Sequence, residues 1–267
     1  MRRSVKLTIG LLALALGWPV GAGADRNADR GAEIFSARDR LDEGFGDQRV
    51  SMQMTLRSAN GRTAERRTRM QLLEGPPGQG DKTLVVFDAP PDIAGTALLT
   101  HEALGVADDS QWLYLPAYKR VKRIAARDRS GSFAGTEFSY EDLAGDKFED
   151  FTYRFVGEAN LRGRQVYRVD RMPIDPNSEY SRQETWVDPD TRQILQAYLY
   201  DKKGRHLKTL ETGDWVRYHG KYWRPRTLAM THVPSGRATL LKTSEYEFGV
   251  GLKEKDFSPD ALSGLGR

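Results

Sequence analysis

Three carboxylates in one short stretch are the side chains whose types and spacing come closest to acid–base chemistry. Glu137, Glu141 and Asp142 follow a loop interrupted by glycines. A pair of carboxylates can act as general acid and general base on a glycosidic bond. Arginines precede this stretch, however, so the acids are also expected in a solvated turn, where they offset positive charge. We favour the turn and keep a hydrolase that uses Glu137 or Glu141 as an alternative.

Other catalytic and metal-binding patterns are missing from the sequence. The four histidines are too scattered to form an HxH or HExxH pair. The chain has no cysteine, which removes thiol nucleophiles, disulfides and cysteine metal sites. The stretch Gly131–Gly135 resembles a nucleophile elbow only superficially, because its serine does not lie midway between the glycines. Neither a P-loop nor a GxGxxG motif is present. We therefore expect that the protein is not an enzyme and that it binds neither a cofactor nor a metal.

A dense basic segment lies just before the acidic turn. Between Tyr118 and Arg129 the only acid is Asp128. Such a segment can guard an edge strand against pairing, or it can contact an anionic headgroup or an acidic partner. The sequence leaves both interpretations open. The candidates for headgroup or partner contact are Lys119, Arg120, Lys122, Arg123, Arg127 and Arg129.

The N-terminus predicts export. Arg2, Arg3 and Lys6 precede an apolar run from Leu7 to Val20, and small residues follow it. This is the pattern of a cleaved leader, expected here over residues 1–24. The run is shorter than the about 20 residues of a membrane span. We therefore expect a soluble periplasmic protein without a lipid anchor, because no cysteine follows the leader.

Removing the leader also changes the charge. The whole chain has 41 basic and 37 acidic residues, and the leader holds three of the basic residues and no acid. Residues 25–267 then carry 38 basic and 37 acidic residues, a net charge of +1. Nucleic-acid binders normally have a clear basic excess, so we expect no nucleic-acid partner. The cations of the basic segment are a local concentration.

Hydrophobic periodicity predicts one helix followed by a long run of strands. Ala28 to Phe45 has helical spacing, and Gly44 and Gly46 mark its end. Alternation begins at Val50, and Asn60-Gly61 predicts a hairpin. Short connections leave no room for parallel crossovers, so the sheet is expected to be antiparallel. The predicted strands are 50–56, 66–73, 82–88, 111–115, 151–155, 165–172, 182–188, 193–200, 205–212, 222–233 and 237–248.

Apolar side chains on these strands either fill a core or line a cavity. Met52, Met54 and Leu56 share one face of the first strand, and methionine packs adaptably against varied ligands. An ordinary core is the simpler interpretation, but a large sheet with one main helix has few elements to cover its apolar face. The cavity candidates are Met52, Met54, Leu56, Trp112, Tyr114, Phe151, Phe155, Trp186, Tyr198 and Met230.

The central stretch resembles a known family. The matching residues are Trp112 to Pro116, Lys119 to Ile124, Ser130 to Phe133, Gly135 and Phe138 to Leu143, with support from Gly44 to Asp47 and Tyr246 to Phe248. On these residues the chain resembles the LolA-like family of outer-membrane lipoprotein-sorting proteins.

The resemblance implies both a fold and a function. The implied fold is an unclosed antiparallel β-barrel of about ten to eleven strands, with an N-terminal helix and a short helical lid, forming one domain over residues 25–267. The implied function is a non-enzymatic periplasmic carrier that shields lipid or lipoprotein acyl chains in an apolar cavity. It would work beside an inner-membrane transporter of the resistance-nodulation-division type. The chain is longer than a classical lipoprotein carrier, so phospholipids and hopanoid-like lipids stay open as cargo. The alternative is an interaction module with a filled core that docks on a transporter.

Overall fold

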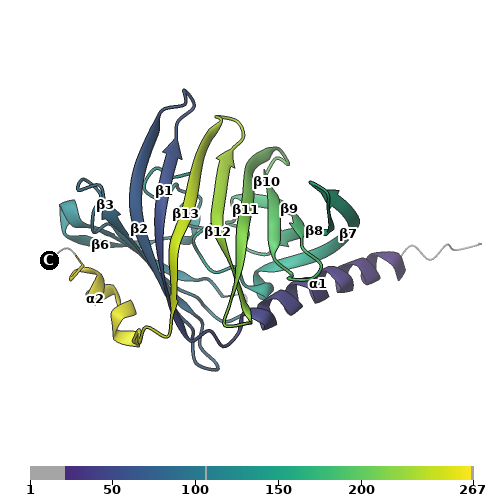
Figure 1. The fold of residues 1–267 in the computed structure, drawn as a ribbon, viewed down its shortest axis with the longest axis horizontal. Helices are drawn as coiled ribbons and strands as arrows, with labels where there is room; N and C mark the ends of the chain where they lie inside the picture. Colours follow the sequence, from purple (N-terminus) through teal and green to yellow (C-terminus); the bar gives the residue numbers. More distant parts are fainter. Residues whose placement is uncertain (1–21, 106, 266–267) are drawn as a thin grey trace, which may run out of the picture.

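The computed structural model describes residues 22–105 and 107–265, and the predicted leader lies almost wholly outside them. The first element is helix α1 (Ala22–Asp42), which ends before Gly44 and Gly46, both with positive φ. Thirteen strands follow, and Figure 1 shows them as one large curved sheet. They are β1 (Asp47–Arg57), β2 (Thr63–Leu73), β3 (Lys82–Ala89), β4 (Ala97–His101), β5 (Ser110–Leu115), β6 (Arg120–Ile124), β7 (Phe151–Leu161), β8 (Arg164–Pro173), β9 (Tyr180–Val187), β10 (Ile194–Asp201), β11 (His206–Tyr218), β12 (Tyr222–His232) and β13 (Arg237–Phe248).

The sheet is antiparallel throughout and does not close. Its order is β6-β5-β4-β3-β2-β1-β13-β12-β11-β10-β9-β8-β7, so the first and last strands, β1 and β13, pair at its centre. Met54 of β1, for example, lies opposite Leu241 of β13. The edges are β6 and β7, which are neighbours in sequence but lie at opposite ends of the sheet. The unclosed antiparallel barrel is therefore confirmed.

The number of strands differs from the prediction of ten to eleven. Two short strands were missed, β4 and β6. β4 has the sequence ALLTH and is buried along most of its length, so it shows no alternation. β6 has the sequence RVKRI, and its cations hide a strand that pairs along its whole length with β5.

Short helical turns complete the fold. One-turn 3₁₀ helices occur at η1 (Pro116–Tyr118), η2 (Ala126–Asp128), η3 (Phe148–Asp150) and η4 (Glu254–Phe257), and α2 (Pro259–Leu262) follows η4. Figure 1 shows α1 crossing one end of the sheet and α2 lying beside the opposite end. No helix among residues 22–105 and 107–265 is long and apolar enough to cross a membrane.

The two faces of the sheet carry separate cores. We call the face that bears Val50, Met52 and Met54 the inner face, and α1 packs on it through Ile34 and Phe35. The opposite, outer face carries a smaller cluster over β3 to β6. That cluster is covered by the C-terminal residues Phe257 and Leu262.

Candidate functional site

The inner face is a continuous apolar surface at the centre of the sheet. Val50, Met52 and Met54 of β1 are buried, with exposures of 0, 8 and 4%. Directly paired residues of antiparallel strands share a face. Met54 therefore lies beside Leu241 of β13, and Val50 beside Met70 of β2. This is the kind of surface that the sequence predicted for the first strand.

A connection rather than a strand covers this surface. The residues between β6 and η3, which we call the interior segment (residues 125–147), join the two edges of the sheet. Phe133 and Phe138 of this segment are 1% and 5% exposed and belong to the inner-face core. The Phe133 ring stacks on Phe87 of β3, with ring centroids 5.2 Å apart. Side chains of the interior segment therefore fill the inner face together with those of α1.

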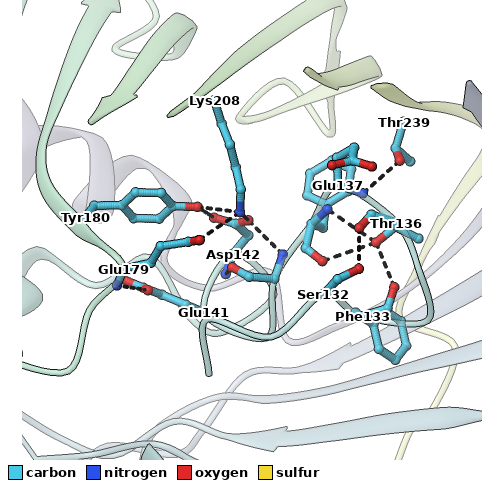
Figure 2. Close-up of polar contacts among 12 residues, drawn as sticks. Ser132, Phe133, Thr136, Glu137, Glu141, Asp142, Glu179, Tyr180, Lys208 and Thr239 are labelled. Atoms are coloured by element: carbon cyan, nitrogen blue, oxygen red, sulfur yellow. Dashed lines mark hydrogen bonds and ion pairs between the residues drawn. The ribbon is translucent and has the colours of Figure 1, made fainter. Parts of the chain in front are cut away.

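Polar contacts hold the middle of the interior segment to the sheet. The Glu137 backbone N–H donates to Thr239 Oγ1 of β13 at 3.0 Å (Figure 2). Arg66 of β2 donates to the Ala134 carbonyl at 2.6 Å. Arg237 Nε lies 2.8 Å from the Glu137 carboxylate. The candidate acid Glu137 is therefore one half of an ion pair.

A buried ion pair holds the next turn of the segment. Lys208 of β11 lies with its Nζ 3.0 Å from Asp142 and 3.0 Å from Glu179 (Figure 2). Its Nζ also donates to the Tyr180 hydroxyl at 2.8 Å, and that hydroxyl donates to Asp142 at 2.7 Å. Burial lowers the pKa of Lys208, but the carboxylates of Asp142 and Glu179 outweigh it and raise the pKa. The lysine is therefore charged and held in a closed network.

The third candidate acid is also engaged. The Glu141 carboxylate accepts from the Ser178 hydroxyl and from the Glu179 backbone N–H, the latter at 2.8 Å. Burial raises its pKa even though both hydrogen bonds oppose that change. All three carboxylates therefore form ion pairs or hydrogen bonds within the protein. These contacts tie the interior segment to the rest of the fold. The predicted solvated turn is in fact half-buried.

Carboxylates gather where the segment ends. Glu102, which follows β4, packs against Gly145, where an added Cβ would lie 2.3 Å from the carboxyl carbon. Burial and the negative charges of Asp81 and Asp109 raise the pKa of Glu102 to about 8. Burial likewise raises the pKa of Asp150 to about 6. The carboxyl groups of Glu102 and Asp150, beside this end of the interior segment, therefore have pKa values close to neutral pH.

An open pocket of about 520 Å³ lies beside the tip of the β1–β2 hairpin. Leu56, Ala64 and Ala238 form apolar parts of its wall, and Gly135 and Glu137 of the interior segment form another side. Its volume is in the range of small-molecule sites. The pocket therefore joins the rim of the inner face to the edge of the interior segment.

The structure brings together six of the ten cavity candidates. Met52, Met54, Phe155 and Met230 are buried in the inner-face core, and Leu56 and Phe151 pack against it. The other four lie on the outer face. Trp112 and Tyr114 pack in the cluster under the C-terminal segment, and the rings of Trp186 and Tyr198 contact each other with centroids 4.6 Å apart.

The four outer-face residues correct the expectation of a single shared face. Leu113 lies opposite Leu98, which belongs to the inner-face core. Trp112 and Tyr114 flank Leu113 in β5, and alternation sends them to the other side. In β9, Thr185 faces inward opposite Ala197, so Trp186 faces outward. Side chains alternate along each strand as predicted. Whether the predicted apolar residues point to the inner or the outer face, however, differs from strand to strand.

The basic candidates also divide into two groups. Lys119, Arg120, Lys122, Arg123 and Arg127 are exposed. Arg129 is mostly buried and has structural partners. Its guanidinium donates to the Asp109 carbonyl at 2.6 Å and lies 3.6 Å from both Asp108 and Asp175. Arg129 therefore anchors the start of the interior segment.

Sequence reasoning missed the elements that fill the inner face. Phe133 and Phe138 lie in an irregular stretch with no helical or strand period, so no pattern marked them as core. Lys208 lies in a predicted strand, and nothing in the sequence around it marks a buried lysine. A usable signal was present in Phe133 and Phe138 themselves, because large aromatics in a loop usually need a buried site.

Comparisons with known proteins agree with this geometry. A family model described only as that of an uncharacterized protein matches residues 79–264. A crystal structure of an outer membrane lipoprotein-sorting protein domain from Vibrio parahaemolyticus is 41% identical, with a TM-score of 0.85 over 89% of this chain and 100% of that one. A DUF1329 family protein from Desulfovibrio piger is 29% identical, with a TM-score of 0.83 over 88% of this chain and 99% of that one.

A LolA superfamily protein from Nitrosomonas europaea shares the fold at 19% identity, with a TM-score of 0.68 over 86% of this chain and 99% of that one. Among curated proteins, none matches the chain. The unclosed sheet, the N-terminal helix and these matches agree with one another. The chain belongs to the family of outer-membrane lipoprotein-sorting protein domains and has the LolA-like fold.

Proposed function

We propose that this protein is a non-enzymatic periplasmic carrier that binds the acyl chains of a lipid or lipoprotein on its inner face. The observation that carries this proposal is the way the inner face is closed. The connection between the two sheet edges and helix α1 cover it, and within residues 22–105 and 107–265 no further layer of strands lies over it. The interior segment can therefore be displaced without breaking a strand pair. The predicted leader supports the periplasmic location.

The phenylalanines of the interior segment mark where an acyl chain would lie. Phe133 and Phe138 are buried among the inner-face side chains. Burial stabilises by about 0.8 kcal/mol per methylene and about 1.5–3 kcal/mol per phenylalanine, so an acyl chain of about 16 methylenes outweighs the two rings. Cargo would replace the rings, and their return would promote release. The pocket at the hairpin tip is the proposed point of entry.

Equilibrium titration with a fluorescent fatty acid tests this proposal, together with native mass spectrometry of protein purified from its own periplasm. Ala64 lies opposite Leu56 on the pocket wall. Ala64→Trp is expected to weaken fatty-acid binding by about tenfold or more, equivalent to about 1.4 kcal/mol. Arg67→Trp is the matched control, because Arg67 is exposed and lies on the other face of the same strand. Absence of both bound lipid and fatty-acid uptake would refute the carrier.

The filled core favours a second candidate, an interaction module of the envelope that has no lipid cargo. In that case the interior segment is a permanent part of the core. Fatty-acid uptake would then be absent, and both tryptophan variants would behave like the wild type. The transporter of the resistance-nodulation-division type that the resemblance implies stays a prediction under either function.

A further inference from the structure

The two edges of the unclosed sheet differ in what lies against them. At the β7 edge, α1 approaches so closely that a Cβ at Gly31 would lie 2.9 Å from the Phe155 backbone nitrogen. Arg30 of the same helix lies over the Phe155 ring, 3.8 Å from its centroid. At the other edge, β6 pairs with β5. Within residues 22–105 and 107–265, the backbone of Arg120–Ile124 forms no hydrogen bond to any other segment.

An edge strand leaves a row of backbone N–H and C=O groups free to pair with another chain. The row on β6 is short, and it is surrounded by positive charge. Arg120, Lys122 and Arg123 are exposed on the strand, and Lys119 is exposed just before it. In the part of the chain that the structure describes, none of the four forms an ion pair, whereas Arg129 nearby is paired with Asp108.

The cations lie on both faces of the sheet. Lys122 is opposite Leu113, which belongs to the inner-face core, so it projects on the inner side. Arg123 is opposite Trp112 and projects on the outer side. A flat membrane surface would meet only one of these sides. An added strand would run between the two rows of charge, and its side chains would alternate toward both.

We propose that the β6 edge binds an extended acidic segment of a partner protein, which adds to the sheet as a further strand. Backbone pairing would supply the affinity, and the cations would select acidic side chains. The exposed side chain of Tyr118, at 75%, lies next to this edge and offers an apolar contact to the same segment. The inference does not depend on acyl binding, because the pocket proposed for entry is lined by residues of β1, β2, β13 and the interior segment, and β6 lies at the far edge of the sheet.

A short synthetic peptide that alternates glutamate and valine is the probe, with binding measured by fluorescence anisotropy at low and high salt. Binding is expected to weaken with salt, because the charges are exposed. The same peptide with every second amide N-methylated keeps its charge but cannot pair, and is expected to bind at least about tenfold more weakly. The double variant Arg120→Glu/Lys122→Glu is expected to lose peptide binding and keep the free energy of unfolding of the wild type, because both side chains are exposed.

Lys202→Glu/Lys203→Glu is the matched control, because it makes the same change of charge on two exposed residues in the turn after β10. It is expected to bind the peptide like the wild type. Equal binding of the N-methylated peptide would overturn strand addition. Absence of peptide binding would also overturn the proposal, and in that case the cations only guard the edge. Binding to vesicles that contain phosphatidylglycerol, without binding to the peptide, would assign the charges to a lipid surface and likewise refute it.

Discussion

Lys208 Nζ lies 3.0 Å from an Asp142 carboxylate oxygen, and both side chains are only 7% exposed. The pair joins β11 to the interior segment. Breaking one partner of a buried pair leaves an uncompensated charge. We therefore expect Lys208→Met to lower the free energy of unfolding by about 3–5 kcal/mol. Urea denaturation followed by tryptophan fluorescence measures this loss.

Two further variants make the Lys208 measurement specific. Asp142→Asn combined with Lys208→Met removes both charges and is expected to recover part of the loss. Arg205→Met breaks a pair with Asp201 in which the arginine is 73% exposed, and is expected to cost at most about 1 kcal/mol. Equal losses for the Lys208 and Arg205 variants would contradict the role of the buried pair.

Glu102 is expected to make the stability of the folded protein depend on pH. Its pKa is raised from 4.5 to about 8 in the folded state, so folding favours the protonated form. The stabilisation is complete below pH 4.5 and is lost as the pH rises through 8. Glu102→Gln fixes a neutral side chain and is expected to flatten the decline of the melting temperature between pH 4.5 and 8, the window between the unfolded and folded pKa values.

Differential scanning calorimetry at several pH values follows the Glu102 effect. Asp39, whose pKa burial raises to about 6, produces a similar decline at lower pH in both proteins and serves as an internal reference. If wild type and Glu102→Gln lose stability in parallel above pH 6, Glu102 does not titrate in this range. Hydrogen exchange near Gly145 would show whether the interior segment loosens with the same midpoint.

The sequence predicts the frame of this molecule well, because strand alternation and turn residues are local signals. The β1–β2 hairpin follows from alternation around Asn60-Gly61, and both strands form where predicted. The missed strands lack those signals. β4 is buried along most of its length and β6 is mostly cationic. Both depend on pairing with β5, which is a tertiary property.

The candidate site was only partly predictable for a related reason. Alternation tells which residues of one strand share a face, but register between strands decides whether that face is the inner one. Trp112 and Tyr114 alternate as predicted and yet point outward under the C-terminal segment. Phe133 reaches the inner face through an irregular connection, which no periodicity describes.

Gly31 holds α1 close to the sheet. An added Cβ would lie 2.9 Å from the Phe155 nitrogen, which is backbone and cannot move aside easily. Alanine at a helical glycine normally gains up to about 1 kcal/mol, but here overpacking is expected to dominate and cost about 1–3 kcal/mol. Urea denaturation of Gly31→Ala measures the sign directly. Glu33→Ala, an exposed change on the same helix, should stay within about 0.5 kcal/mol. A stabilised Gly31→Ala protein would show that the helix can shift.

Phe133 and Phe257 form a matched pair for testing the carrier, because each is 1% exposed and they lie on opposite faces. Phe→Ala is expected to lower the free energy of unfolding by about 3–5 kcal/mol at either position. Only Phe133 occupies the space proposed for an acyl chain, so Phe133→Ala is expected to strengthen fatty-acid binding, while Phe257→Ala leaves it unchanged. Titration with a fluorescent fatty acid, at a temperature where both variants are folded, separates the two effects. Weaker or absent binding in Phe133→Ala would mean that its ring belongs to a permanent core, as the interaction module requires.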